Sequence, residues 1–215
     1  MAYIDPNAVR TVTSIGGGPI GGGWAAHFLA RGYDVVAYLH DQNEEESYRS
    51  IVDTAWKSLT DLGVAEGASL ERLTLTFKLN NAVKDTDFLQ ESAPERLEIK
   101  QALYKELGDI VPAHVVIGSS TSGLTMSDIQ AKCSTPKRCI IAHPFNPPYL
   151  LPLVELVGGK LSDPSAVTWA EDFYTLADKS PLVMKKEIPG FVATRLQEAL
   201  WREALHMVAN GEATP

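Results

Sequence analysis

The sequence predicts an α/β fold with a doubly wound, mainly parallel sheet, followed by one further helix. β-rich segments alternate with amphipathic helical segments along most of the chain, which is typical of a parallel sheet with helices on both faces. A glycine cluster, residues 16–23, stands between the first strand and the first helix. After Ile188-Pro189-Gly190, apolar residues recur at helical spacing and predict a last helix with an apolar face.

Composition narrows the class of protein. With 45% hydrophobic and 21% charged residues among 215, the chain has the composition of a globular protein rather than of a collagen, disordered or disulfide-rich one. No apolar run approaches the ~18 residues of a membrane span, and the first ten residues lack the pattern of a signal peptide. We therefore expect a cytoplasmic protein that makes no membrane contact.

Charge and cysteine content exclude two more classes. The formal net charge is −8, and no basic stripe is present to neutralise phosphates, so we expect no nucleic-acid partner. The sequence has two cysteines, Cys133 and Cys139, too few for a disulfide framework. We expect both to be reduced thiols without a function.

The first fifty residues predict a β-α-β unit. Residues 11–15 form the first strand, a helix runs from the glycine cluster to Arg31-Gly32, and residues 34–39 form the second strand. A long helix then begins in the acidic run 41–46. Further strands are expected at 73–79, 87–90, 115–119, 139–142, 153–157 and 182–185, and the last helix over 192–208, ending at Asn210-Gly211.

The glycine cluster contains a dinucleotide fingerprint, Gly16-x-Gly18-x-x-Gly21. Gly16 permits a tight turn, Gly18 lets the backbone approach a pyrophosphate, and Gly21 lets the helix pack on the strand. Pro19 and Ile20 open the helix whose N-terminus attracts the anion. This context predicts a Rossmann-like nucleotide site at these five residues. The alternative is a glycine-rich loop that binds nothing.

The carboxylate that binds the adenosine ribose normally ends the second strand, where this chain has Leu39. Asp41 either reaches the ribose from two residues downstream or merely caps the next helix, and the sequence leaves both roles open. No arginine stands nearby for a 2′-phosphate, which Asp41 and the acidic residues 44–46 would repel. We therefore expect NAD as the cofactor, and we expect no metal.

A proline-rich reversal, residues 144–152, joins two apolar strands that carry His143 and Glu155. A carboxylate is costly to bury alone, so we expect the two side chains to meet. A carboxylate neighbour fixes the tautomer of an imidazole and stabilises its protonated form, which suits a general base that accepts a proton from an alcohol. If the first of these strands is parallel, its end faces the ligand crevice of the sheet. The alternative is a structural histidine.

Small hydroxyl residues follow the strand that ends at Ser119. In the run Ser120-Thr-Ser-Gly-Leu124, Ser122 is a candidate to hydrogen-bond a substrate oxygen. Thr125-Met-Ser-Asp128 then resembles a helix capping box. Helix capping is therefore the alternative role for this serine cluster.

Five segments in order, GGGPIGGGWAA, ESAPERLEIKQALYKEL, SSTSGLTMSDI, AHPFNPPYLLPLVELVGG and IPGFVATRLQEAL, resemble successive motifs of the 3-hydroxyacyl-CoA dehydrogenase family. They cover the chain from about residue 11 to its end. The segment HPFNPPYLLPLVE looks closer to the branch of L-carnitine and L-gulonate 3-dehydrogenases, which oxidise small free 3-hydroxy acids, than to the CoA-ester branch, which more often has HFFNP.

The resemblance implies a role for particular residues. It implies His143 as the catalytic histidine, Glu155 as its orienting carboxylate and Ser122 as the hydroxyl that contacts the substrate. It also puts Glu95 and Lys100 beside the nicotinamide half of the cofactor, whereas composition alone predicts a solvated helix face there.

Two further residues complete the implied site. Asn146 in the HPFN turn is implied as an active-site residue, with turn formation as the alternative. The family motif GFVANRL has an active-site Asn where this chain has Thr194. A threonine still donates a hydrogen bond to the substrate, but with a shorter reach and no amide carbonyl. We expect reduced activity or a shifted substrate preference.

The motif order divides the chain into an NAD-binding Rossmann-like domain, residues 1–188, and the start of a truncated helical domain, residues 189–215. In the family that second domain supplies dimer contacts and one wall of the substrate site, so we expect a homodimer if it is present. The apolar stripe from Val192 to Val208 must pair with another copy or pack on its own domain.

The leading hypothesis is an NAD-dependent oxidoreductase that interconverts a small 3-hydroxy acid, carnitine-like or gulonate-like, and its 3-oxo acid. One alternative is a 3-hydroxyacyl-CoA dehydrogenase, although the acidic balance offers few cations for the phosphates of an acyl-CoA. Another is a dinucleotide-binding module that does no chemistry.

Overall fold

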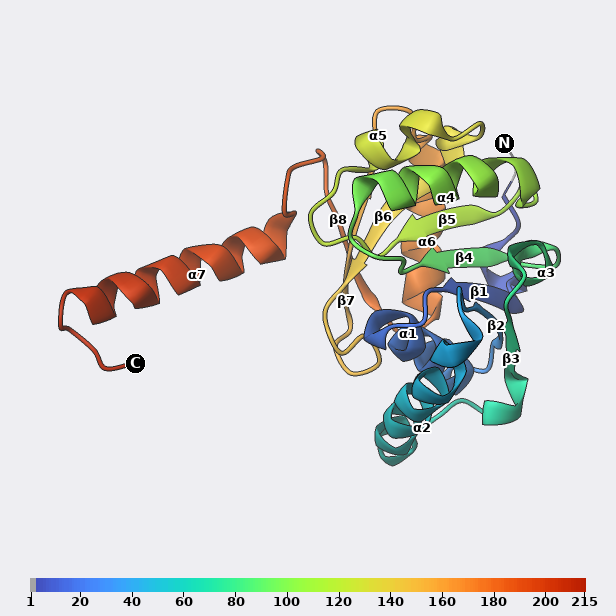
Figure 1. Ribbon diagram of the computed structural model, residues 1–215, viewed down its shortest axis with the longest axis horizontal. Helices are drawn as coiled ribbons and strands as arrows, with labels where there is room; N and C mark the ends of the chain where they lie inside the picture. Colours follow the sequence, from blue (N-terminus) through green and yellow to red (C-terminus); the bar gives the residue numbers. More distant parts are fainter. Residues whose placement is uncertain (1–2) are drawn as a thin grey trace.

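The computed structural model describes residues 3–215, and within them eight strands form one sheet in the order β3-β2-β1-β4-β5-β6-β7-β8 (Figure 1). The strands are β1 (Thr11–Ile15), β2 (Asp34–Tyr38), β3 (Leu73–Thr76), β4 (Phe88–Glu91), β5 (Val116–Ser119), β6 (Cys139–Pro144), β7 (Leu153–Gly158) and β8 (Ser180–Val183). The pair β6 and β7 is antiparallel, and the other neighbouring pairs are parallel. The predicted mainly parallel sheet is confirmed.

Helices cover both faces of the sheet. They are α1 (Pro19–Ala30), α2 (Glu45–Leu62), α3 (Leu79–Val83), α4 (Leu97–Ile110), α5 (Met126–Ile129) and α6 (Pro164–Leu176), whereas α7 (Val192–Ala209) covers neither face (Figure 1). One hydrophobic cluster contains residues of α1, α2 and α6, and the other contains residues of α3, α4 and α5. Successive strand residues point to opposite faces, so Val116 of β5 lies in the first cluster and Ile117 in the second.

The strand positions match the prediction within three residues, and two of the differences have a local reason. The strand expected over 73–79 ends at Thr76 because Leu79 already begins α3. The strand expected over 182–185 lies at Ser180–Val183 and includes Pro181. It is the edge strand of the sheet, where a missing backbone N–H is tolerated.

The last helix, α7, extends away from the rest of the molecule (Figure 1). It ends at Ala209, and Gly211 follows with φ +73°, which confirms the predicted helix stop. Leu196, Leu200 and Trp201 are 62%, 73% and 61% exposed. The apolar stripe therefore does not pack on its own domain, and its pairing with another copy stays a prediction.

The expected division into domains at residue 188 falls between β8 and α7 and stays a prediction. Residues 1 and 2 of the expected first domain lie outside the described residues. Both cysteines are buried free thiols, with their Sγ atoms 3.9 Å apart. Among residues 3–215, none of the helices has the length and apolar character of a membrane span.

Lys179 fixes the loop that joins β6 to β7. Its ammonium group donates to the carbonyl groups of Pro148 and Leu151 and lies 5.1 Å from the ring centre of Trp24. The side chain is buried. Burial and, to a smaller extent, the charge of Arg31 lower the pKa of Lys179 to about 7.

The lowered pKa of Lys179 predicts that stability rises at mildly alkaline pH. The unfolded chain keeps this lysine protonated up to its ordinary pKa of 10.5, whereas the folded chain releases the proton above about 7. Between these values the unfolded state binds more protons, so this group adds up to about 1.4 kcal/mol per pH unit to the free energy of unfolding. Urea unfolding between pH 7 and 9 should show the rise in the wild type and a smaller one in Lys179→Met. Equal slopes in the two proteins would contradict it.

Candidate active site

The parallel strands bring the candidate residues to one edge of the sheet. The carboxyl ends of β1, β4, β5 and β6 are neighbours at this edge. The glycine turn follows β1, the segment 92–95 follows β4, the serine cluster 120–122 follows β5, and His143 lies near the end of β6. This edge is the ligand-binding edge of a doubly wound sheet.

The antiparallel strand β7 brings Glu155 to His143. The two residues are direct register partners, and such partners point to the same face of a sheet. The Nδ1 atom of His143 lies 2.8 Å from Oε2 of Glu155. Glu155 is fully buried, and His143 is 8% exposed. The expected meeting of the two side chains is confirmed.

The second oxygen of Glu155 is also occupied. Its Oε1 accepts the main-chain N–H groups of Val192 and Ala193, both at 2.8 Å, in the first turn of α7. Burial raises the pKa of Glu155, but the bonds from the histidine and from these two N–H groups outweigh burial and lower the pKa overall. The ionised carboxylate holds the proton of the neutral imidazole ring on Nδ1 and leaves Nε2 for a ligand.

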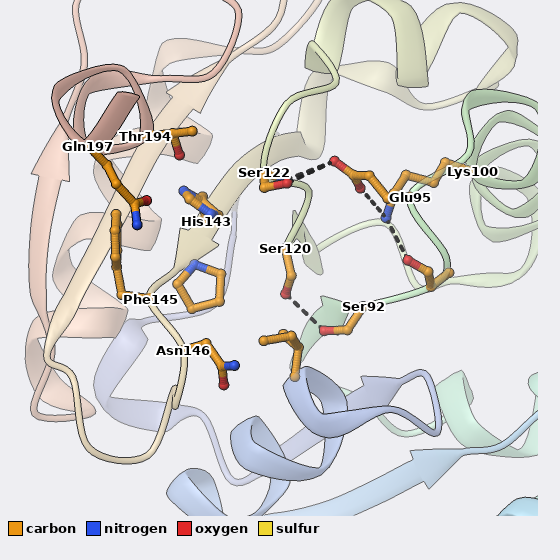
Figure 2. A pocket seen from close by; sticks show the side chains of 13 residues that line it. Ser92, Glu95, Lys100, Ser120, Ser122, His143, Phe145, Asn146, Thr194 and Gln197 are labelled. Atoms are coloured by element: carbon orange, nitrogen blue, oxygen red, sulfur yellow. Dashed lines mark hydrogen bonds and ion pairs between the residues drawn. The ribbon is translucent and has the colours of Figure 1, made fainter. Parts of the chain in front are cut away.

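His143 opens onto a cavity of about 440 Å³ (Figure 2). The cavity gathers most of the predicted catalytic and substrate-binding residues and several others; it is lined by Ile20, Ser92, Glu95, Lys100, Ser120, Ser122, His143, Phe145, Asn146, Thr194 and Gln197. Gln197 lines the cavity although it was not predicted as a site residue. Its signal was its position three residues after Thr194, on the same face of α7. Gln197 offers the cavity an amide, the group that Thr194 lacks.

Lys100 differs from the solvated helix face that composition predicts, whereas the side chain of Glu95 is 43% exposed. Lys100 is 1% exposed, and its Nζ lies 2.6 Å from Oε1 of Glu91 and 3.8 Å from Oε2 of Glu95. Glu95 precedes α4 and accepts the hydroxyl of Thr121 at 2.5 Å and the N–H of Ser122 at 2.9 Å. The Glu95 carboxylate therefore orients the loop that carries Ser122.

The glycine turn fits a pyrophosphate. Gly16 has φ +116°, and a Cβ there would lie 2.4 Å from the carbonyl oxygen of Ser92, so the turn requires glycine. A Cβ on Gly21 would lie 2.1 Å from the carbonyl oxygen of Gly16. A Cβ on Gly18, by contrast, would have no atom within 4 Å. The space beside Gly18, at the N-terminus of α1, is open for an anion.

A second cavity, of about 470 Å³, lies between the glycine turn and the end of β2. Its apolar wall includes Leu79, Ile99 and Leu103, and Glu44 lines it, whereas Asp41 does not. Both carboxylates belong to one capping box, in which Asp41 accepts the N–H of Asn43 at 2.9 Å and Oε2 of Glu44 accepts the N–H of His40 at 3.1 Å, so the lining of the cavity alone separates them. We therefore take Glu44 as the candidate for the ribose diol, a role that sequence analysis did not give it.

A comparison with models of known protein families identifies the family of this chain. Residues 11–188 match the family model described as 3-hydroxyacyl-CoA dehydrogenase, NAD binding domain. The chain belongs to this family. This match agrees with the glycine turn and with the open space beside Gly18.

Relatives of known name are similar over nearly the whole chain. An L-carnitine dehydrogenase of Streptomyces griseus is 56% identical over 209 residues, which are 97% of this chain and 62% of the relative. An L-carnitine dehydrogenase of Pseudomonas putida is 47% identical over 206 residues, 96% of this chain and 64% of the relative. The chain thus spans less than two thirds of the length of these relatives.

Solved structures confirm the Rossmann-like fold. A 5-formyl-3-hydroxy-2-methylpyridine 4-carboxylic acid 5-dehydrogenase, described as an NAD⁺-dependent dismutase, aligns with a TM-score of 0.88 and 32% identity over 96% of this chain and 67% of that one. The 3-hydroxybutyryl-CoA dehydrogenase of Escherichia coli aligns with a TM-score of 0.88 and 27% identity over 96% of this chain and 44% of that one.

Replacing Gly18 by alanine should separate nucleotide binding from folding. Gly18 has φ −85°, so alanine fits the backbone, and the new methyl group fills the open space beside the turn. We expect NADH affinity to fall by about tenfold or more, which is 1.4 kcal/mol, with stability unchanged within about 0.5 kcal/mol. Titration calorimetry and urea unfolding measure the two quantities. Unchanged NADH affinity would place the pyrophosphate elsewhere.

Replacing Glu44 by glutamine should weaken selection of NAD over NADP. The charge of Glu44 favours a ribose diol and repels a 2′-phosphate. We expect NADH affinity to fall by about fivefold, or roughly 1 kcal/mol, with a smaller fall for NADPH. Glu46→Gln, on the exposed face of α2, removes the same charge and is the control. Equal effects of the two variants on the ratio of NADH to NADPH affinity would count against a direct contact.

Proposed function

We propose that this chain carries the nucleotide site and the catalytic pair of an NAD-dependent dehydrogenase that interconverts a small free 3-hydroxy acid of the carnitine type and its 3-oxo acid. One observation carries the proposal. The imidazole of His143, held at Nδ1 by the ionised Glu155, faces a cavity at the same sheet edge as the glycine turn.

The residues of the cavity account for the proton transfer. His143 accepts the proton of the substrate hydroxyl at Nε2, and the charge of Glu155 stabilises the imidazolium that forms. The hydroxyl groups of Ser122 and Thr194 line the same cavity. The hydroxyl of Ser122 donates to Oε1 of Glu95 at 3.4 Å, and it would exchange this long bond for one to the reacting oxygen, which Thr194 can also hold. Bound NAD⁺ supplies the acceptor for the hydride that leaves the substrate carbon.

The charges of the cavity favour a free acid with a quaternary ammonium group over an acyl-CoA. Lys100 is engaged by the buried Glu91 and is not available to a phosphate. Phe145 offers an aromatic face and Glu95 a negative charge, both of which attract a quaternary ammonium group. The amides of Asn146 and Gln197 can donate to the carboxylate of the acid.

The proposed function includes an oligomeric state and a cellular compartment for the protein. The exposed apolar residues of α7 support a homodimer in which this face is covered. The thiols of Cys133 and Cys139, free at 3.9 Å from each other, support a reducing compartment, the cytoplasm.

Removing the proposed base should stop the reaction and leave cofactor binding intact. We expect His143→Ala to lower kcat by about 10²-fold to 10⁴-fold, because positioned proton transfer contributes that much. NADH affinity should stay within about twofold of wild type. His206→Ala, exposed on α7, is the matched control. Wild-type turnover in His143→Ala would remove the assignment.

Three substrates assayed together with the wild type separate the remaining alternatives. We expect oxidation of L-carnitine with NAD⁺, with a higher kcat/KM than for L-gulonate, which lacks the quaternary ammonium group. A higher kcat/KM for 3-hydroxybutyryl-CoA would favour the acyl-CoA alternative. NADH binding with no oxidation of any of the three would favour a dinucleotide-binding module.

A further inference from the structure

A buried chain of hydrogen bonds ends at the cavity on two serines that the proposed reaction does not use. Tyr174 of α6 donates its hydroxyl to Oε1 of Gln90 on β4. The Nε2 of Gln90 donates to Oγ of Ser120 at 2.8 Å. The hydroxyl oxygens of Ser120 and Ser92 lie 2.8 Å apart (Figure 2). Tyr174 and Gln90 are fully buried, whereas both serines line the cavity.

The carbonyl group of Ala142 fixes which groups donate and which accept in this series of hydrogen bonds. That carbonyl can only accept, and it lies 3.3 Å from Nε2 of Gln90. The NH₂ group of Gln90 therefore faces Ala142 and Ser120, and its oxygen faces Tyr174. Ser120 consequently accepts a hydrogen bond from Gln90 rather than donating one to it.

The two serines are left with one unused donor. They have two hydroxyl hydrogens, one of which lies in the bond between them. Among the described residues, neither side chain donates to a further acceptor. The pair therefore presents one directed O–H donor to the cavity, and its complement is a ligand oxygen that accepts.

The strand order places this donor between the glycine turn and the catalytic histidine. Along the sheet edge β1, β4, β5 and β6 are consecutive, so the turn, Ser92, Ser120 and His143 follow one another. Neighbouring strands lie ~4.8 Å apart, which puts the serine pair one to two strands from the turn. Ser92 also supports the turn directly, because its N–H donates to the carbonyl of Ile15 at 2.7 Å.

We propose that the hydroxyl pair of Ser92 and Ser120 donates a hydrogen bond to an oxygen of the nicotinamide nucleoside, either a ribose hydroxyl or the carboxamide oxygen. Gln90 and Tyr174 are positioning residues that hold the pair in its donating arrangement. The inference rests on the proposed function in taking NAD as the cofactor. Its test needs binding alone and no turnover.

Three nucleotides distinguish the parts of the cofactor. In Ser120→Ala, titration calorimetry should show NADH affinity lowered by about fivefold to tenfold, the effect of one lost hydrogen bond, and ADP affinity unchanged. If the affinity for ADP-ribose falls as much as that for NADH, the acceptor is a ribose hydroxyl. If the affinity for ADP-ribose is unchanged, the acceptor is the carboxamide oxygen. Both outcomes support the proposal.

A second pair of variants tests the positioning role. Tyr174→Phe should lower NADH affinity by a smaller factor than Ser120→Ala and leave ADP affinity unchanged. The reason is that Oε1 of Gln90 then loses its hydrogen bond from the tyrosine, so the amide is held less firmly. Tyr104→Phe is the matched control, since the hydroxyl of Tyr104 is buried with no hydrogen-bond partner. Its NADH affinity should equal that of the wild type.

Unchanged NADH affinity in Ser120→Ala overturns the proposal, and so does equal weakening of NADH and ADP. Unchanged NADH affinity with a raised KM for the substrate overturns it as well, because the serines then contact the substrate. A wild-type chain that binds none of the three nucleotides defeats the proposed cofactor and this inference with it. A wild type that binds NADH and shows the predicted Ser120→Ala pattern, yet oxidises no substrate, defeats the proposed reaction and supports this inference.

Discussion

One buried carboxylate, that of Glu155, joins parts of the site that come from distant segments of the chain. Its Oε2 is bonded to His143 on β6, and its Oε1 accepts two N–H groups from the start of α7. A buried carboxylate without partners would cost several kcal/mol, and these three bonds offset that cost. The orientation of the histidine and the position of the helix start therefore depend on the same group.

The backbone that leads into α7 turns toward this carboxylate. Gly190 and Phe191 both have positive φ, +72° and +50°, and they turn the backbone so that the first N–H groups of α7 face Glu155. The ring of Phe191 is fully buried, with its centre 5.4 Å from that of His143. A strained backbone at a non-glycine residue is typical of a functional site that the surrounding packing holds in place. The same turn brings Thr194 and Gln197 to the cavity.

Much of the fold and the contact of the proposed catalytic pair could be predicted because their signals are local. Apolar periodicity and the glycine turn predict the sheet, and two apolar strands joined by a short reversal predict that His143 meets Glu155. The burial of Lys100 could not be predicted from composition, because its partner Glu91 ends a strand that contributes no charge pattern to α4. Nor could the sequence show that Glu44 rather than Asp41 lines the second cavity, since the two acids belong to one capping box.

The tautomer of His143 tests the central role of Glu155 most directly. Nitrogen-15 NMR of histidine-labelled protein, at a pH where the ring is neutral, reports which ring nitrogen carries the proton, and the His143→Ala spectrum identifies the signals. The carboxylate of Glu155 predicts a protonated Nδ1 and an unprotonated Nε2. A ring protonated at Nε2 would contradict this account, because the nitrogen that faces the cavity could not then accept a proton.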